Sequence, residues 1–305
     1  YKWRYNTAAQ RDIPTYLSTV PCAFESRAQL QEELFGCVGA CSAALDGSGN
    51  NAYCFTGSSG PWRSGTGAAC TDINNWNVEA VTDMNRLFAM AFTFNQPLGN
   101  WQVVRVTDME QMFRDARVFN QDLSNWNVVR VTSMRDMFMS AFAFNQDLTY
   151  WNVKKVTDMT SMFINARGFN QPLHWDVSAV TNMDSMFYNA SAFNQPLTWN
   201  VSPVTDMGSM FAYAAAFNQP LDWDVSAVTA FDDMFDETHY SDCNKRLTHT
   251  AFSVYWSGWK DDWAFLCTAE PADLNALKTY VDSWIADPTG TQRAHGRIGI
   301  WDVSR

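Results

Sequence analysis

Several features that mark familiar protein classes are missing from this chain of 305 residues. No apolar run approaches the roughly 18 residues that a membrane-spanning helix requires. Tyr1 opens a segment without the basic-then-apolar order of a signal peptide, so we expect that a leader has been removed or that the numbering begins inside a longer precursor. Lys and Arg number only 21 against 32 acidic residues, and the net charge of −11 argues against nucleic acid as a partner.

Catalytic signatures are missing as well. The sequence contains no Gly-x-Ser-x-Gly, His-Glu-x-x-His or phosphate-binding loop. Its histidines lie far apart along the chain, at His174, His239, His249 and His295. We therefore expect a protein that is not an enzyme and that carries no cofactor. An active site would have to lie in the irregular parts, around 255–263 or in the N-terminal loops.

Cysteine is absent from the centre of the chain and gathers near both ends, at Cys22, Cys37, Cys41, Cys54, Cys70, Cys243 and Cys267. In secreted proteins disulfides brace segments that bury too little apolar surface, so this placement predicts an extracellular protein. A zinc site is the disfavoured alternative, because His is scarce near Cys37 and Cys41. We expect a disulfide between Cys243 and Cys267. The pairing of the five N-terminal cysteines stays open, and the odd total leaves one thiol free or bonded elsewhere.

What the chain has in abundance is repetition. Phe-Asn-Gln-(Pro or Asp)-Leu occurs six times between Phe94 and Leu221, and each copy precedes a Trp-x-Val step. The tryptophans recur every 24 or 25 residues, at Trp76, Trp101, Trp126, Trp151, Trp175, Trp199 and Trp223. Repeats of this length predict coils that stack into a solenoid. We expect the Trp, Phe and Met columns to fill its core rather than to hold a cofactor.

Two elements are predicted in each coil, giving an α/β repeat. Apolar residues fall on one face of a short helix at Val81, Met84, Leu87, Phe88 and Ala91. Thr82 and Asp83 suit the start of that helix, where a hydroxyl and a negative charge are favourable. The segment that follows, 94–103, contains Pro97 and lacks helical spacing. We expect extended chain there, with a short strand parallel to its equivalents about 4.8 Å away.

The repeats divide the chain into segments. We expect 1–21 to be the possible tail of a preceding module, 22–75 to be a Cys-rich N-terminal cap, and 76–235 to be the solenoid of about seven coils. A C-terminal cap over 236–270 follows, since a solenoid otherwise exposes the apolar face of its last coil. The remaining 271–305 is expected to form a helix and the start of a next repeat array, because Trp301-Asp-Val-Ser matches the line at Trp175.

The repeating unit Val-Thr-Asp-Met-x-x-Met-Phe-x-x-Ala-x-x-Phe-Asn-Gln-x-Leu-x-x-Trp-(Asn or Asp)-Val resembles the 25-residue repeat of BspA-type surface proteins and bacterial surface lipoproteins, a divergent branch of the leucine-rich repeats. The resemblance covers about 76–235. It implies a right-handed leucine-rich-repeat-like solenoid, export to the cell surface, and roles in adhesion or extracellular assembly. It implies no catalytic residues.

Two polar columns run through the repeats. The asparagines Asn95, Asn120, Asn145, Asn170, Asn194 and Asn218 are expected to bond the backbone of neighbouring coils rather than a ligand. The second column contains Asp83, Asp108, Asp158 and Asp206 and is interrupted by Ser133 and Asn182. Capping of helices is the favoured role of these carboxylates, and calcium chelation between coils is the alternative.

Basic residues concentrate in the middle coils of this acidic chain. Arg105, Arg130 and the pair Lys154 and Lys155 precede the Val-Thr step of successive coils. Arg117 and Arg167 lie on the predicted helix side. We take these six residues as candidate partner contacts, for an acidic protein or an acidic glycan. An ordinary solvated face is the alternative.

Two sequons, Asn189-Ala-Ser and Asn200-Val-Ser, predict N-glycosylation in an extracellular protein. Asn189 is the better candidate, because it is expected at the exposed end of a helix, whereas Pro203 follows the second sequon. The sequence as a whole favours an extracellular structural or adhesive protein, a module of a larger cell-surface or filament assembly that acts through protein–protein contacts. A glycan-binding module is the alternative.

Overall fold

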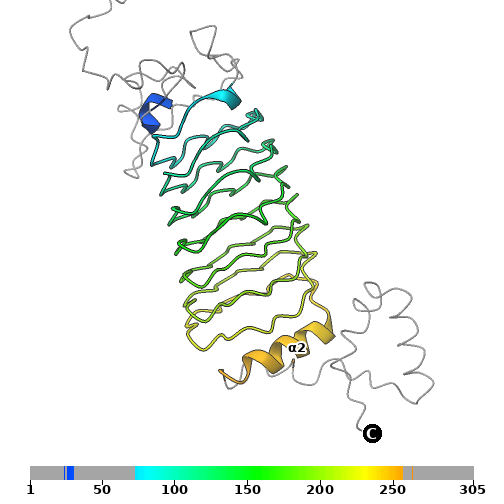
Figure 1. Cartoon of the computed structure of the whole chain (residues 1–305). Coiled ribbons are helices and arrows are strands. Elements are labelled where there is room, and N and C mark those ends of the chain that lie inside the picture. Colours follow the sequence, from blue (N-terminus) through cyan, green and yellow to red (C-terminus); the bar gives the residue numbers. More distant parts are fainter. Residues whose placement is uncertain (1–23, 25, 31–72, 257–262, 264–305) are drawn as a thin grey trace, which may run out of the picture.

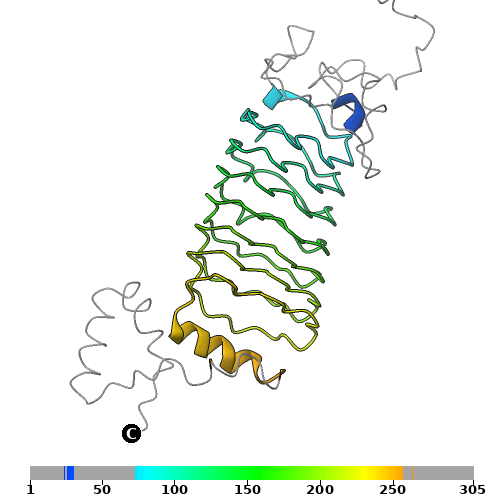
Figure 2. The same ribbon diagram turned by 180° about the vertical axis from the view of Figure 1, so that it is seen from behind.

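The computed structural model describes residues 24, 26–30, 73–256 and 263. From Trp76 to Tyr240 the backbone winds through similar coils that lie one on another in an elongated stack, seen from opposite sides in Figures 1 and 2. The helical elements named within the described residues are η2 (Ile73–Asn75) and α2 (Asp242–Phe252). The expected segments 1–21 and 271–305 lie outside the described residues.

Columns of aromatic rings form the interior of the stack. Phe88 and its equivalents stack on one another from coil to coil with ring centroids 5.4 to 5.9 Å apart. The column that begins at Phe94 has spacings of 5.8 to 6.2 Å and ends on Tyr240. Tryptophans of successive coils stack with ring centroids 6.2 to 6.5 Å apart from Trp101 to Trp151 and again from Trp175 to Trp223. The seven tryptophans of the repeat are at most 5% exposed, which confirms the prediction that they fill the core.

The prediction of a helix at 81–91 and at the equivalent segments of the other coils is wrong. The apolar residues of that segment are buried as expected, but the backbone forms a series of turns. Every second N–H points along the stack: those of Met84, Arg86 and Phe88 donate to carbonyls of the next coil. The N–H groups between them close turns onto the third residue back, as Leu87 does on Met84. We call this segment of the coils the turn ladder.

Two residues in each turn ladder have left-handed backbone conformations. In the coil that follows Trp101 they are Gln111 and Asp115, with φ of 56° and 57°. The φ values of the equivalent residues in the other coils range from 49° to 60°. These conformations turn alternate N–H groups towards the neighbouring coil, which a helix cannot do. Turns that close every three or four residues place apolar side chains at nearly the same spacing as a helix does, and this similarity explains the error.

The parallel pairing between coils also lies in the turn ladder rather than in the predicted strand at 94–103. Isolated parallel bridges join Asp83 to Asp108 and continue through the equivalent residues as far as Ala230. Beside them, each Thr accepts from the next Thr through both N–H and hydroxyl, as Thr82 O does from Thr107 at 2.8 and 3.1 Å. Backbone bonds therefore join the coils along this side of the stack, and the Thr hydroxyls add a side-chain bond at each step.

On the other side of the stack, side chains link the coils. Asn120 Oδ1 accepts from the backbone N–H of Asn145 at 2.9 Å and from Gln146 Nε2 at 2.8 Å, and the same bonds recur along the column. This confirms that the asparagine amides bond neighbouring coils. From Trp126 to Trp223 each indole N–H donates to the Leu carbonyl of the preceding coil, as Trp126 does to Leu98 at 2.9 Å, and Trp101 donates to Ile73 O at 2.7 Å.

The coils have two lengths, and the difference lies in one place. In 25-residue coils a two-residue turn, such as 99–100 or 124–125, separates the Leu from the Trp. In the 24-residue coils a single residue stands between them, as His174 does between Leu173 and Trp175. The indole bond to the Leu carbonyl is retained in both cases, at 2.9 Å for Trp126 and 2.8 Å for Trp199.

Helix α2 lies across the last coil (Figure 1). It continues the hydrogen-bond pattern of the coils. The N–H of Ser241 and the Nδ2 of Asn244 both donate to Asn218 Oδ1, where the next Asn and Gln of the repeat would stand. Tyr240 stacks on Phe217 and donates its hydroxyl to Gln219 O at 2.8 Å. Cys243 is disulfide-bonded, and its predicted partner Cys267 lies outside the described residues, as do the five N-terminal cysteines.

Candidate interaction surfaces

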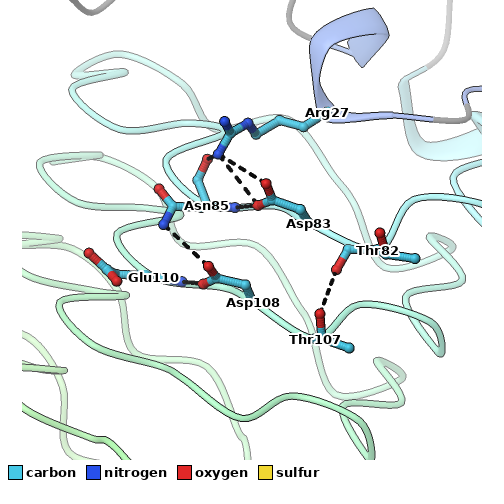
Figure 3. A network of polar contacts seen from close by, with 7 residues as sticks. All are labelled: Arg27, Thr82, Asp83, Asn85, Thr107, Asp108 and Glu110. Atoms are coloured by element: carbon cyan, nitrogen blue, oxygen red, sulfur yellow. Dashed lines mark hydrogen bonds and ion pairs between the residues drawn. The ribbon is translucent and has the colours of Figure 1, made fainter. Parts of the chain in front are cut away.

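The turn ladder carries the acidic column. Asp108 Oδ1 accepts from the N–H of Glu110 at 2.8 Å, and Asp83 binds Asn85 in the same way (Figure 3). Asn85 Nδ2 reaches Asp108 Oδ2 at 3.4 Å, and Arg27 pairs with Asp83 at 3.3 Å. Each of these carboxylates thus accepts from the backbone N–H two residues further on and stabilises a tight turn. The predicted role, capping of a helix, is wrong. Within the described residues no group of three His, Cys, Asp or Glu side chains suits a metal ion.

Burial shifts the pKa of three carboxyl groups on this face. It raises the pKa of Glu110, Asp136 and Asp184 above their ordinary values. Asp136 is 8% exposed and accepts from Gln111 Nε2 at 3.1 Å, while Arg135 and Arg114 oppose the effect of burial. A pKa raised in the folded state means that ionised Asp136 destabilises the fold at neutral pH.

We expect Asp136→Asn to raise the melting temperature at pH 7 by about 2–4 °C, the shift that ~1 kcal/mol produces in a domain of this size. The amide oxygen still accepts from Gln111, whereas the buried charge is gone. The advantage over the native chain should shrink as the pH falls through the raised pKa towards 3.8. Thermal melts between pH 7 and pH 4 measure both effects.

Asp224→Asn is the control with the opposite sign. Hydrogen bonds from Ser226 lower the pKa of Asp224, so its ionised form stabilises the fold at pH 7 and that contribution is lost on acidification. Equal responses of the two variants to pH would contradict the assignment of Asp136 as a destabilising buried charge.

The six basic candidates lie at two different corners of the coils. Arg105, Arg130 and Lys155 occupy the turns just before the turn ladder and form an exposed column, the basic column. Within the described residues no ion pair involves any of these three. Lys154 pairs with Asp176 of the next coil at 3.4 Å.

Arg117 and Arg167 lie at the other corner, in the turns that follow the turn ladder. There they alternate with two phenylalanines in successive coils. The Cζ of Arg117 lies 4.6 Å from the Phe92 ring centroid and 5.7 Å from that of Phe142, and the Cζ of Arg167 lies 5.4 Å from the Phe142 centroid. Cation–π contacts of this kind hold a guanidinium in place while its edge faces solvent. We call these four residues the aromatic–arginine column.

Other large side chains lie next to this column in the sequence, as Val118 does, or in the coils that follow it, as Tyr188 and Tyr213 do. Val118 is 45% exposed and Tyr213 47%, and Tyr188 packs against Tyr213 with ring centroids 5.3 Å apart. Together with the aromatic–arginine column they form one long edge of the stack, the aromatic edge. Sequence reasoning singled out its arginines but missed Phe92, Phe142 and the tyrosines. Alignment of the residue ten places after each coil's first Thr would have shown the alternation of Phe and Arg.

Charge is distributed unevenly along the stack. Residues 168–244 contain ten acidic residues and no Lys or Arg. The basic column and the aromatic–arginine column both end at or before Arg167. The stack is therefore acidic over its C-terminal coils, and its exposed cations belong to the N-terminal coils.

A groove separates α2 from the last coils. It has a volume of about 680 Å³, and its lining includes Trp199, Trp223, Asp222, Asp224 and Tyr255. Val254 and Tyr255, at its rim, are 76% and 43% exposed. The exposed ring of Tyr255 and the exposed carboxylates of Asp222 and Asp224 place an apolar surface beside hydrogen-bond acceptors.

The two predicted glycosylation sites differ from expectation. Asn189 is not at a helix end: it is half-buried in the turn ladder, and its Nδ2 donates to Asn165 Oδ1 at 2.7 Å. Asn200 is exposed, and its Oδ1 accepts from the N–H of Ser202 at 3.2 Å. Because modification requires a free amide nitrogen at the surface, the geometry favours Asn200 of the two.

Comparison with known proteins identifies one family. A family model described as a Mycoplasma protein of unknown function, DUF285, matches residues 62–174 and 172–251. No curated protein and no solved structure matches the chain. Within the residues that the structure describes, no helix combines the length and hydrophobicity needed to cross a bilayer.

Proposed function

Because the chain belongs to the DUF285 family, whose description names no activity, we propose its function from the surface that the stacked coils present. We propose that it is a divergent leucine-rich-repeat solenoid of BspA type that serves as an extracellular structural or adhesive protein, a module of a larger surface or filament assembly. In this role it is not an enzyme and binds through protein–protein contacts.

The observation that carries this proposal is the division between interior and surface in every coil. The Trp, Phe, Met and Asn residues of the repeat are buried or bonded between coils, as Asn120 and Trp126 are. The side chains that vary from coil to coil lie at the corners, among them Arg105, Arg130 and Arg117. A rigid scaffold that repeats its exposed positions adds many weak contacts through avidity. The bonded Cys243 agrees with an oxidising compartment.

A glycan-binding module is the second candidate, and the groove beside α2 is the feature that favours it. Asp222, Asp224 and Tyr255 offer an aromatic and acidic lining there. The basic column is a further binding surface for acidic glycans.

Two measurements test the proposed function. A membrane-impermeant amine reagent applied to intact cells that make the protein should label Lys154 and Lys155, because both are exposed on the stack. A cytosolic protein in the same cells is the control. Beads coated with the protein should adhere to those cells, whereas the same protein on a glycan array should bind no sugar. Labelling only after lysis would contradict the surface location, and saturable binding of a glycan would favour the second candidate.

A further inference from the structure

The aromatic edge changes character along its length. At the N-terminal end it carries Arg114 and Arg117 with exposed Phe92 and Val118, and Asp115 lies 3.8 and 3.9 Å from the two guanidinium groups, which leaves a net positive charge. At the C-terminal end the positions equivalent to Arg114 and Asp115 are Asp236 and Glu237, and both are exposed. The N–H of Tyr213 donates to Asp236 O at 2.7 Å, which places these carboxylates directly after the tyrosines.

The edge thus contains both members of a complementary pair. A surface that is net positive at one end and negative at the other is complementary to itself when a second copy runs in the opposite direction. With two copies in the same direction and in register, Arg117 would face Arg117 and Glu237 would face Glu237. Antiparallel pairing is therefore the arrangement that charge favours.

We propose that the aromatic edge is a self-association surface on which a second copy of the chain packs antiparallel about a two-fold axis. The proposal deepens the proposed function, because it names the like module that the edge binds, and it rests on that function. Arg117 of one copy faces Glu237 of the second copy, and Arg114 lies near Asp236 of the second copy.

This register also gives favourable neighbours in the two inner pairs of coils. Counting coils inwards from Arg117 and Glu237, Phe142 faces Tyr213 and Arg167 faces Tyr188. The first of these is an aromatic pair and the second a cation–π pair. Phe, Tyr and Arg are also the residues enriched in protein interfaces. The two-fold axis lies between the coils of Arg167 and Tyr188, so no like charges meet there.

The charge of the C-terminal coils also favours the antiparallel arrangement. Residues 168–244 hold ten acidic residues without a Lys or Arg. In the antiparallel pair each acidic half lies beside the half of the second copy that carries the exposed arginines. Long-range attraction between the halves guides encounter in the opposite orientation, and added salt screens it.

Sedimentation velocity on the full chain, over a range of concentrations and at two salt concentrations, tests the proposal. We expect a monomer–dimer equilibrium that weakens several-fold between about 0.05 and 0.5 M salt. Arg117→Glu and Glu237→Lys should each weaken the dimer by at least about tenfold, because each places like charges at two symmetric contacts. The double variant should recover most of the native affinity.

Arg105→Glu is the matched control, since it makes the same charge change at the other corner and should leave the dimer unchanged. Thermal melts confirm that each variant is folded. A native chain that stays monomeric, single variants with native affinity, a double variant without recovery, or an equal loss in Arg105→Glu would each overturn the proposal. A monomeric chain that still labels on intact cells and adheres as beads would leave the proposed function standing. A dimer found in a chain that labels only after lysis would support self-association and contradict the proposed surface location.

Discussion

Replacing Phe138 by Ala should lower the free energy of unfolding by about 3–5 kcal/mol, the range for removal of a buried ring. Phe138 is 0% exposed and lies at the centre of the aromatic columns. Its ring centroid is 4.0 Å from that of Phe144 in the same coil, and 5.6 and 5.7 Å from those of Phe113 and Phe163 in the adjacent coils. The deletion therefore leaves a cavity bordered by three coils. Urea or thermal unfolding measures the loss.

Tyr150→Ala is the control, because it removes a ring of similar size from the next turns of the same coil. Tyr150 is 83% exposed, and its loss should change stability by no more than about 0.5 kcal/mol. Similar effects of the two substitutions would mean that the aromatic columns do not form the core, and the stacked arrangement would be contradicted with them.

Asn244→Ala should loosen α2 from the end of the stack and cost about 1–3 kcal/mol, the range for leaving buried polar groups without a partner. Asn244 is 6% exposed, and its Nδ2 donates to Asn218 O at 2.7 Å and to Asn218 Oδ1 at 2.9 Å. Hydrogen exchange should quicken in the last coil, where Tyr240 and Phe217 meet, and remain unchanged around Phe94. Local loss of protection is expected because each coil contacts only its neighbours.

Lys245→Ala, at the adjacent position of α2, is the matched control. Its Nζ pairs with Asp242 Oδ1 at 3.3 Å on the surface, a contact worth less than about 1 kcal/mol. If Asn244→Ala quickened exchange evenly through all the coils, α2 would act on global stability rather than as a cap of the last coil.

The burial pattern could be predicted from the sequence, whereas the backbone that produces it could not. Val81, Met84, Leu87 and Phe88 were expected inside, and each is fully buried. The spacing of apolar residues does not distinguish an α-helix from successive turns whose N–H groups bond the neighbouring coil. The deciding feature is the left-handed backbone at positions such as Gln111 and Asp136. Neither residue type requires that conformation, so the sequence carries little local signal for it.

The polar columns were easier to interpret than the surface. A short amide repeated at every coil has few uses besides bonding the next coil, and the Asn column does this. Exposed side chains are under no such constraint. The contact of Arg117 with Phe92 and Phe142 depends on which residues of three successive coils share a corner. That information becomes available only when the coils are aligned in space.

The difference in coil length shows where this architecture accepts extra chain. Between Leu173 and Trp175 a single residue is enough, and Leu98 and Trp101 are joined by two, while the indole bond from each Trp to the preceding coil is kept. The length of the turn between Leu and Trp can therefore change without shifting the residues that pack inside the stack. Evolution, or a protein engineer, can lengthen this turn in a chosen coil and insert a peptide there without repacking the aromatic rings of the core.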